Sequence, residues 1–552
     1  MRVFYKDKDL TFKNDDNKLI DLINGNLQDE KMKILAARVD NEIKSLDYPI
    51  NKGSEVELID CTDKDGMRVY IRGICYIMCM AFNQLYPEAK IIINYQLTNS
   101  MFCECFNMKI TEEIIANVKN KMQEIIDSNK ELKKVIMTKQ EAVEFYESHN
   151  IPEDDRRGYL QVDNEDKDEV SLYFCDDYFN YFYGVMPLTT AYTNIFDLRQ
   201  YKNGFIVQYP NPSDPTKVGE FKESKKFLST LQEYENIYNL MEIGTIADLN
   251  KKLREGKGKE VILMSEAMQE KKIAEIADEI AKEKTLKMIL IAGPSSSSKT
   301  TFARKLGMQL RVNGLKPVTI GTDDYFVERE DTPRLPNGDY DFECIGALDV
   351  DLFNDHLEKL INGETIKMPS FDFKTGHKTY SDDRTLSLKE DEILVIEGIH
   401  CLNDELTSKI KKENKFKIYI SDLTILNADN YNRISTTDTR LVRRIVRDYN
   451  YRGYSALETL RRWPSVNEGE QKNIFPYQEE ADVMFNSSLV YELAVLGKYA
   501  RPLLAKISRD EPEYSEAKRI RTFLEYFDDL DEEPIPNNSL LREFIGGSVF
   551  AD

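Results

Sequence analysis

Short apolar runs alternate with amphipathic segments along the second half of the chain. The runs lie at Lys287–Ala292, Pro317–Gly321, Ile393–Ile396 and Phe416–Ile420. Apolar residues at helical spacing follow the first run, over Thr301–Val312. Short runs separated by helices are typical of a parallel β-sheet that is covered on both faces. The pattern therefore predicts an α/β domain in this half.

The first half has a different arrangement. Strand-like runs at Met1–Tyr5 and Glu55–Ile59 flank a helical pattern over Leu19–Ala37. Together they predict a small α+β module at residues 1–58. A helix, a strand and a charged surface helix are then predicted at Val69–Asn83, Lys90–Tyr95 and Ile110–Lys130.

Two further segments separate and follow these regions. The proline-rich tract Pro210–Lys217 predicts a surface loop or domain boundary. A charged, largely helical pattern over Phe221–Lys284 predicts a helical connector at residues 226–285. Leu489–Asp552 is helical and then loop-like, which predicts a helical C-terminal extension at residues 491–552.

Composition limits the class of protein. A chain of 552 residues predicts several domains, and 41% hydrophobic with 31% charged residues is an ordinary globular mixture. The sequence lacks the roughly 18 consecutive apolar residues of a membrane span, and its first residues lack the apolar core of a signal peptide. Eight scattered cysteines fit reduced thiols, so we expect a cytoplasmic protein without membrane contact. The net charge of −22 means that any contact with RNA needs a local basic patch.

A candidate phosphate-binding loop follows the first apolar run. The sequence from Gly293 to Thr301 matches G-x-x-x-x-G-K-[ST] except at the second glycine, which is Ser298. Backbone N–H groups and a helix N-terminus would surround a polyphosphate, Lys299 would contact its β and γ oxygens, and Thr300 would bind Mg²⁺. The predicted nucleotide-binding residues of the loop are Gly293, Pro294, Ser295, Ser296, Ser297, Ser298, Lys299, Thr300 and Thr301.

Two interpretations of this loop remain open. A serine-rich turn could simply cap a helix, although the order of strand, loop, Lys-Thr and helix favours nucleotide binding. If the position of Ser298 requires a positive φ, the serine costs about 1–3 kcal/mol, and if the position is helical the cost is small.

Two acidic residues follow later apolar runs. Asp323 comes just after Pro317–Gly321, and Glu397 directly follows Ile393–Ile396. Sheets of this class present ligands at the carboxyl ends of their strands. Phosphoryl transfer needs a carboxylate to orient or deprotonate a hydroxyl, and acids to hold the metal. An aspartate after a strand is often only a helix cap, but the loop upstream favours the functional interpretation.

Arginines gather at helical spacing near the end of the domain. Arg440, Arg443, Arg444 and Arg447 crowd one face, and Arg452 follows. Like charges at such spacings destabilise a bare helix, so an arriving anion would explain them. The alternative is a solvated helix face whose arginines pair with Asp438 and Asp448.

Together these motifs resemble the uridine kinase and phosphoribulokinase family over about residues 286–490. The motifs are GPSSSSKTT, TDDYF, YDFECIGALD (Tyr340–Asp349), PSFDF (Pro369–Phe373), VIEGIH (Val395–His400) and TDTRLVRRIVRDYNYRG (Thr437–Gly453). The resemblance implies an α/β P-loop NTPase fold that transfers the ATP γ-phosphate to a sugar hydroxyl of a nucleoside. By position, Asp323 would be the general base, Thr300, Asp323 and Glu397 would surround Mg²⁺, and Arg444, Arg447 and Arg452 would bind phosphate.

The same resemblance implies an acceptor pocket at Tyr325, Phe342, Phe371 and His377. Uridine kinases usually have a histidine three residues after the Tyr-Asp-Phe segment. Here Phe371-Asp372-Phe373 is followed by Lys374-Thr375-Gly376-His377, so Gly376 takes that place and His377 lies one residue beyond. Kinase chemistry is thus better supported than uridine specificity.

The first half resembles the two N-terminal domains of threonyl-tRNA synthetase. The motifs are NQLYPEAK (Asn83–Lys90), NSMFCEC (Asn99–Cys105) and ITEEII (Ile110–Ile115). The resemblance implies a β-grasp module, called a TGS domain, at 1–58 and a second, α+β domain at 59–225. That second domain edits mischarged tRNA with an H-x-x-x-H pair, whose positions hold Arg72 and Tyr76 here. Editing is therefore not expected, while an RNA contact of this half stays open.

Four cysteines of the second domain are candidate zinc ligands. Cys75 and Cys79 are one helical turn apart, and Cys103 and Cys105 share one face of a strand. Four thiolates suit zinc, but the spacings differ from C-x₂-C knuckles, and free cysteines are commonly buried as small hydrophobes.

Two functions follow from these patterns. The first is an ATP- and Mg²⁺-dependent kinase that acts on a small-molecule nucleoside or sugar. The second is a nucleotide-sensing or RNA-binding protein with a weakened kinase core, which Ser298 and the displaced histidine favour. Kinases of this family often form homo-oligomers, so self-association is a further expectation.

Overall fold

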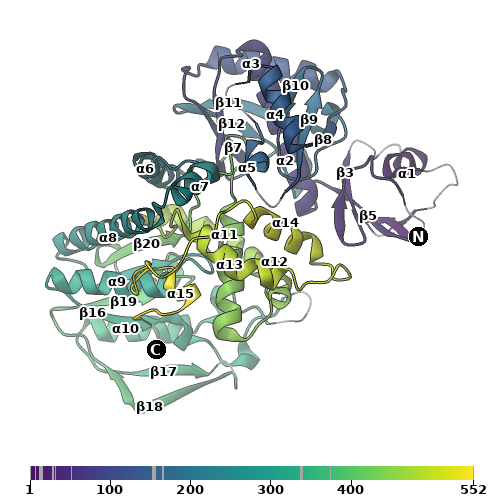
Figure 1. Cartoon of the computed structure of the whole chain (residues 1–552). Coiled ribbons are helices and arrows are strands. Elements are labelled where there is room, and N and C mark those ends of the chain that lie inside the picture. Colours follow the sequence, from purple (N-terminus) through teal and green to yellow (C-terminus); the bar gives the residue numbers. More distant parts are fainter. Residues whose placement is uncertain are drawn as a thin grey trace.

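The computed structural model describes residues 2–6, 8–10, 17–27, 30, 33–50, 53–151, 157–164, 167–335, 338, 340–372 and 375–550. The N-terminal residues form a small module beside a second domain, and both lie on one side of the larger C-terminal part (Figure 1). In the described part of the chain, no helix has the length and apolar character needed to cross a membrane.

The N-terminal module is a five-stranded sheet with one helix. The strand order is β2 (Lys8–Asp9), β1 (Arg2–Tyr5), β5 (Glu55–Asp60), β3 (Ile34–Val39) and β4 (Glu42–Lys44), and α1 spans Leu19–Asn26. The predicted helix over Leu19–Ala37 is therefore wrong beyond Asn26. Ile34–Val39 is a nearly continuous buried run rather than one face of a helix, and it pairs antiparallel with β5.

The second domain contains two antiparallel sheets. The first has the order β11 (Asp197–Tyr201), β12 (Gly204–Gln208), β7 (Ser100–Cys105), β6 (Ile91–Leu97), accompanied by α2 (Lys64–Leu85), α3 (Glu112–Asp127) and the 3₁₀-helix η3 (Thr190–Thr193). The second has the order β10 (Tyr178–Asn180), β9 (Glu169–Cys175), β8 (Lys133–Thr138), accompanied by α4 (Lys139–Ser148) and α5 (Tyr159–Asp163). Pro210–Lys217, predicted as a surface loop or domain boundary, forms most of a hairpin of β13 (Pro210–Asn211) and β14 (Asp214–Val218).

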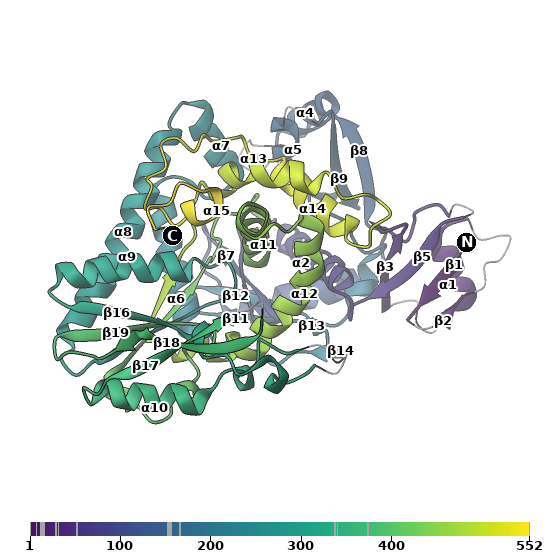
Figure 2. The same cartoon turned by 90° about the horizontal axis from the view of Figure 1, so that it is seen from below.

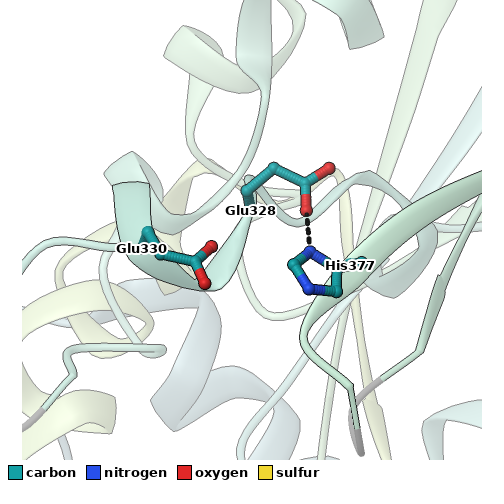
Figure 3. Close-up of side chains that lie close together, drawn as sticks. All are labelled: Glu328, Glu330 and His377. Atoms are coloured by element: carbon teal, nitrogen blue, oxygen red, sulfur yellow. Dashed lines mark hydrogen bonds and ion pairs between the residues drawn. The ribbon is translucent and has the colours of Figure 1, made fainter.

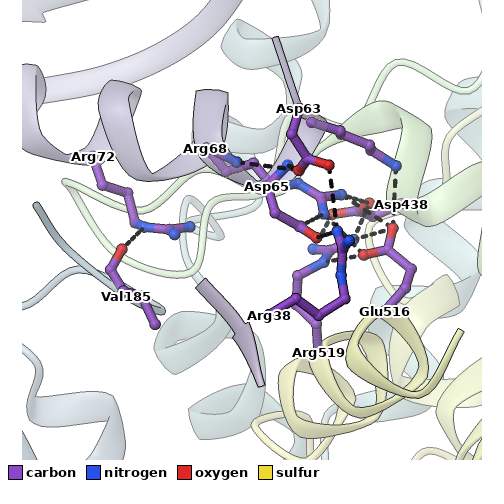
Figure 4. Close-up of polar contacts among 11 residues, drawn as sticks. Arg38, Asp63, Asp65, Arg68, Arg72, Val185, Asp438, Glu516 and Arg519 are labelled. Atoms are coloured by element: carbon purple, nitrogen blue, oxygen red, sulfur yellow. Dashed lines mark hydrogen bonds and ion pairs between the residues drawn. The ribbon is translucent and has the colours of Figure 1, made fainter. Parts of the chain in front are cut away.

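The editing positions of this domain are occupied by structural contacts. The Arg72 guanidinium donates to the Val185 carbonyl at 2.9 Å (Figure 4). The Tyr76 hydroxyl is fully buried and lies 3.1 and 3.2 Å from the carbonyls of Tyr173 and Tyr178. Both side chains therefore stabilise the fold at these positions.

Three helices connect the halves: α6 (Lys225–Leu240), α7 (Ile246–Arg254) and α8 (Gly258–Lys282). They occupy the predicted helical segment. The C-terminal side of α8 carries buried Ile273, Ile276 and Ile280 into the core of the following domain, so the last connector helix is packed onto the sheet.

That domain is built on a parallel sheet with the order β16 (Lys316–Gly321), β19 (Glu392–Glu397), β15 (Met288–Ala292), β20 (Lys415–Ser421), β21 (Val483–Asn486). Alternate residues of the buried central strand β15 enter different cores. Ile289 and Ile291 meet α8 and α9 (Lys299–Val312), whereas Met288 and Leu290 meet α10 (Val350–Ile361). Both faces are covered (Figure 1), which confirms the predicted α/β fold class.

The remaining elements surround this sheet. An antiparallel hairpin of β17 (Ile366–Asp372) and β18 (His377–Leu386) projects along its lower side in Figure 1. Helices α11 (Thr436–Arg447), α12 (Ala456–Asn473), α13 (Glu492–Leu504), α14 (Tyr514–Leu524) and the short α15 (Arg542–Ile545) complete the chain. The predicted helical C-terminal extension thus contains α13, α14 and α15.

A cluster of charged side chains joins the two halves (Figure 4). Arg68 of α2 lies 2.9 Å from Glu516 of α14 and 3.8 Å from Asp438 of α11. Arg519 of α14 donates to both oxygens of Asp438, at 2.7 and 2.6 Å, and also contacts Glu516. Two arginines and two carboxylates from three helices therefore share one interface, which we call the interdomain cluster.

Candidate active site

The phosphate loop connects β15 to α9. Gly293 is needed where the loop leaves the strand, because a Cβ atom there would lie 1.9 Å from the Ile420 carbonyl oxygen. Ser296 and Ser298 have φ values of +62° and +66°. Ser298 is the residue before α9 and adopts the left-handed conformation, with ψ of 33°. Of the two possibilities for Ser298, the one that strains the backbone is the one observed.

The loop forms one wall of a cavity of about 980 Å³. Within the described part of the chain, the hydroxyls of Ser296, Ser297 and Ser298 are buried and have no hydrogen-bond partner. Lys299 Nζ donates to the carbonyls of Gly293 and Pro294 at 2.8 and 3.1 Å, and burial lowers its pKa. Unpaired hydroxyls beside a buried lysine suit an anionic ligand with several acceptor oxygens.

Two carboxylates and a hydroxyl meet at the carboxyl ends of neighbouring strands. Glu397 ends β19, and Asp323 lies in the 3₁₀-turn Thr322–Tyr325 that follows β16. Thr300 Oγ1 lies 3.0 Å from both carboxylate oxygens of Glu397. Burial raises the pKa of both acids. All three line the cavity, and oxygen donors of this kind are the ligands that Mg²⁺ prefers.

The predicted arginines divide into two groups. Arg440 and Arg443 are almost completely buried, so the solvated-face alternative is wrong for them. Arg440 holds both oxygens of Glu470 at 2.6 and 2.9 Å, and Arg443 donates to Glu492 at 2.7 Å. Each also donates to a carbonyl of the phosphate loop, at 3.2 and 3.3 Å. These two arginines therefore support the loop from behind.

The other three arginines line the cavity. Arg444, Arg447 and Arg452 surround the buried carboxylate of Asp448 at 3.2, 3.1 and 3.5 Å. The alternative interpretation paired these arginines with Asp438 and Asp448; the pairing with Asp448 is observed, whereas Asp438 belongs to the interdomain cluster. A single carboxylate among three arginines gives this cluster an excess of positive charge, while Glu343, Glu470 and Glu543 add carboxylates elsewhere on the cavity wall.

The predicted acceptor residues are only partly brought together. Phe342 lines the cavity. Tyr325 is buried and does not line the cavity, and its hydroxyl lies 3.0 Å from His356 Nδ1. Phe371 is buried against Phe326, a cavity residue, with ring centroids 5.5 Å apart. The substrate role of Tyr325 and Phe371 would therefore be indirect, and it stays a prediction.

His377 lies outside the cavity lining, at the start of β18. Its Nδ1 is 2.9 Å from a carboxylate oxygen of Glu328, and its side chain is 57% exposed (Figure 3). Gly376 has a φ of +81°, and a Cβ atom there would lie 2.7 Å from Arg329, so no histidine fits that position without strain. Phe373 and Lys374, part of the same predicted motif, lie outside the described residues.

Two groups of candidate metal ligands lie outside the cavity. Among described residues, the group with ligand atoms close enough to share an ion is Glu328, Glu330 and His377, all near the surface (Figure 3). The four candidate zinc ligands form no such group; they are Cys75, Cys79, Cys103 and Cys105. Burial raises the pKa of the Cys75 thiol to about 12, which fits the alternative of buried free cysteines.

Several cavity residues have no signal in the sequence. Glu470 accepts a hydrogen bond from the Ser295 backbone N–H at 2.8 Å. Glu543, from the C-terminal extension, accepts one from Thr301 Oγ1 at 2.7 Å. Their partners are 175 and 242 positions away, so no local pattern could reveal them.

Fold and geometry together define the class of protein. A parallel sheet, a phosphate loop that opens a helix, and acids at the ends of neighbouring strands form a P-loop kinase-type nucleotide site. The buried, unpaired loop hydroxyls fit the phosphates of a nucleotide, and Thr300 with the two carboxylates fits Mg²⁺.

Comparison with known proteins agrees with this class. Residues 288–493 match the model of the Phosphoribulokinase / Uridine kinase family. A uridine kinase of Ureaplasma parvum is 27% identical over 179 residues, which cover 32% of this chain and 77% of that protein. A uridine kinase of Clostridium perfringens is 28% identical over 176 residues, covering 32% and 74%. These matches support a kinase-type phosphoryl transfer.

The N-terminal part is similar to a different protein. A threonine–tRNA ligase of Clostridium kluyveri is 31% identical over 121 residues, which are 22% of this chain. The match covers only 19% of the ligase.

Among solved structures, a possible uridine kinase from Bacillus stearothermophilus is similar to part of this chain. It has 20% identity and a TM-score of 0.26, and the match covers 38% of this chain and 97% of that one.

Proposed function

We propose that this protein transfers the γ-phosphate of ATP to a hydroxyl group of a nucleoside or a related sugar. The observation that carries the proposal is the convergence of Lys299, the Thr300–Glu397 pair, Asp323 and the three cavity arginines on one cavity beside the loop. In the reaction the acceptor oxygen forms a bond to Pγ, the bond from Pγ to the bridging oxygen breaks, and ADP leaves.

The residues divide this work between them. Asp323 would take the proton of the attacking hydroxyl, and burial, which raises its pKa, makes it a stronger base. Lys299 and the loop N–H groups would hold the β- and γ-phosphates, while Arg444 and Arg447 would neutralise charge that develops during transfer. Bound Mg²⁺, held by Thr300, Asp323 and Glu397, would polarise the phosphate oxygens.

The domain arrangement is part of the proposal. We propose that five parts of the chain act together in this reaction. They are a TGS-like module (1–58), a synthetase-like domain without an editing pair (59–225), a helical connector (226–285), the kinase domain (286–490) and a C-terminal extension (491–552). The observation in favour is the interdomain cluster, which ties α2 of the first half to α11 and α14.

A panel assay tests the reaction. The protein is incubated with Mg-ATP and a series of nucleosides and sugars, and phosphorylated products are detected by mass spectrometry. We expect turnover with at least one acceptor, and its loss in Lys299→Ala and Asp323→Ala. Lys271→Ala is the matched control, because this side chain is 77% exposed on α8. Arg444→Ala should lower turnover far more than ATP affinity.

A second candidate is a nucleotide sensor with a weakened kinase core. It is favoured by the strained Ser298 and by the glycine at the place of the family histidine. Tight ATP binding with no phosphorylated acceptor would support the sensor. Product formation that depends on Asp323 would exclude it.

A further inference from the structure

The C-terminal extension returns to the phosphate loop. Leu541 and Phe544 are fully buried, and the Arg443 guanidinium lies 5.2 Å from the Phe544 ring centroid. Asn450 Nδ2 donates to the Phe544 carbonyl at 3.0 Å. In Figure 2, α15 lies beside α11. This end of the chain is therefore a packed part of the domain.

The same segment also contacts α9. Lys305 Nζ donates to the Asn538 carbonyl at 3.0 Å, and the Arg542 guanidinium donates to the carbonyls of Glu532 and Ile535 at 2.8 Å. These bonds fix the backbone before Glu543, and the Asn450 bond to the Phe544 carbonyl fixes it directly after. Its carboxylate is thereby held in place rather than free to turn into solvent.

The Glu543 carboxylate lies at the part of the cavity that the negatively charged phosphates of a nucleotide would occupy. It lines the cavity and accepts a hydrogen bond from Thr301 Oγ1 at 2.7 Å. Thr301 is in the first turn of α9, whose N–H groups and dipole attract anions. The three unpaired hydroxyls of the loop lie in the same cavity wall. Phosphates bound there would lie close to a carboxylate of the same sign.

The electrostatics of the cavity agree with this placement. Burial lowers the pKa of Lys299, and the charge of Glu543 acts in the opposite direction. Burial raises the pKa of Glu397, and the charge of Glu543 adds to that effect. Glu543 is thus close enough to influence both the lysine and a metal-binding acid.

A role as a third metal-binding acid fits less well. Thr300 and Thr301 are consecutive, yet their hydroxyls contact different carboxylates, Glu397 and Glu543. The family match ends at residue 493, so the matched region does not include Glu543.

We propose that Glu543 is an affinity-determining residue of the nucleotide site, whose carboxylate competes with nucleotide phosphates for the N-terminus of α9. Nucleotide must either displace this carboxylate from Thr301 or bind against its repulsion. Affinity for polyphosphates then depends on the position of the C-terminal extension. The inference rests on the proposed function, because it assumes that ATP occupies this cavity.

Removal of the charge tests the proposal. Glu543→Gln keeps the size of the side chain and an oxygen that can accept from Thr301. We expect the Kd for Mg-ATP and for Mg-ADP to fall about tenfold or more, which corresponds to about 1.4 kcal/mol for each factor of ten. The Kd for adenosine, which carries no phosphate, should not change. A purely structural disturbance would alter all three.

Glu533→Gln is the matched control, because Glu533 is exposed on the same segment and loses the same charge. Titration calorimetry gives the constants, and circular dichroism checks folding. If Glu543→Gln does not fold, Glu543→Ala takes its place. Unchanged or weaker ATP binding in the variant, with ATP still bound by the natural chain, overturns this inference alone. If neither the natural chain nor the Glu543 variant binds ATP, the proposed function fails and this inference fails with it.

Discussion

Replacement of Ser298 by glycine is the sharpest test of the phosphate loop. Ser298 has φ of +66° and ψ of 33°, a conformation that glycine adopts without strain. Its hydroxyl is buried and has no hydrogen-bond partner among the described residues. Ser298→Gly should therefore stabilise the nucleotide-free protein.

The magnitude follows from three contributions. Relief of the left-handed conformation contributes about 1–2 kcal/mol. Removal of the buried, unpaired hydroxyl contributes about 1 kcal/mol. The greater freedom of glycine in the unfolded chain costs about 0.4–1 kcal/mol. The free energy of unfolding should thus rise by about 1–2.6 kcal/mol, and by less when phosphate oxygens satisfy the hydroxyl.

The assay uses the single tryptophan of the chain. Trp463 is buried on α12, and the guanidinium groups of Arg440 and Arg444 lie 5.5 and 5.9 Å from its ring centroid. Its fluorescence in increasing urea follows unfolding of the kinase domain beside the site. The measurement is made without nucleotide, and the midpoint and slope are compared between variants.

Ser297→Gly is the matched control. Ser297 also carries a buried, unpaired hydroxyl, but its φ is not in the left-handed region. The difference between the two variants therefore isolates the backbone contribution, about 1–2 kcal/mol in favour of Ser298→Gly. If Ser298→Gly is no more stable than Ser297→Gly, the strain assigned to this serine is refuted.

Three further predictions concern the charged residues. Arg440→Ala should lower the free energy of unfolding by about 3–5 kcal/mol in the same urea assay, because it leaves a buried carboxylate unpaired. Arg452→Ala should reduce turnover while changing stability by less than about 1 kcal/mol, since its side chain is half exposed; equal turnover would remove it from the site. Burial acts to raise the pKa of Glu516, but the charges of Arg519 and Arg68 hold it well below its usual value. Its stabilising effect should be complete above pH about 4.5 and be lost as the pH falls further, and melting curves of Glu516→Gln should lack that part of the acid sensitivity.

The sheet could be predicted because its strands carry an unambiguous pattern. Every residue of Met288–Ala292 is buried, since helices cover both faces, and the run is short and ends at the turn that begins with Gly293, which favours a strand over a helix. The prediction over Leu19–Ala37 was wrong where this distinction is weaker. Gly25 and Asn26 end the helix, and the apolar run Ile34–Val39 that follows has too few polar positions to show a period.

The site was predictable as far as local order determines it. Lys299 and Asp323 follow strands and Glu397 ends one, and the carboxyl ends of parallel strands meet at one edge of the sheet. The arginines could not be divided in the same way. Burial of Arg440 and Arg443 depends on carboxylates 30 and 49 positions away, which no spacing within the helix reveals.

Helix α11 links the two halves of the molecule physically. Its first turn carries Asp438 into the interdomain cluster, and its last turn carries Arg444 and Arg447 to the cavity, about 9–14 Å away along the axis. The backbone hydrogen bonds of one continuous α-helix join these two ends. A movement of the first half that displaces Asp438 would therefore also displace Arg444 and Arg447.

The charges of the interdomain cluster indicate how loss of a contact from the first half would affect the second half. Arg68 comes from the first half, while Arg519, Asp438 and Glu516 belong to the second. Without Arg68, Asp438 and Glu516 keep Arg519 and the more exposed Lys64, which lies 3.2 Å from Glu516, and the loss of one positive charge destabilises the contact of α14 with α11. Helix α14 belongs to the same extension that carries Glu543 to the phosphate loop. We therefore expect removal of the Arg68 charge to change the position of the extension that carries Glu543, and with it the Kd for Mg-ATP, although Arg68 does not line the cavity.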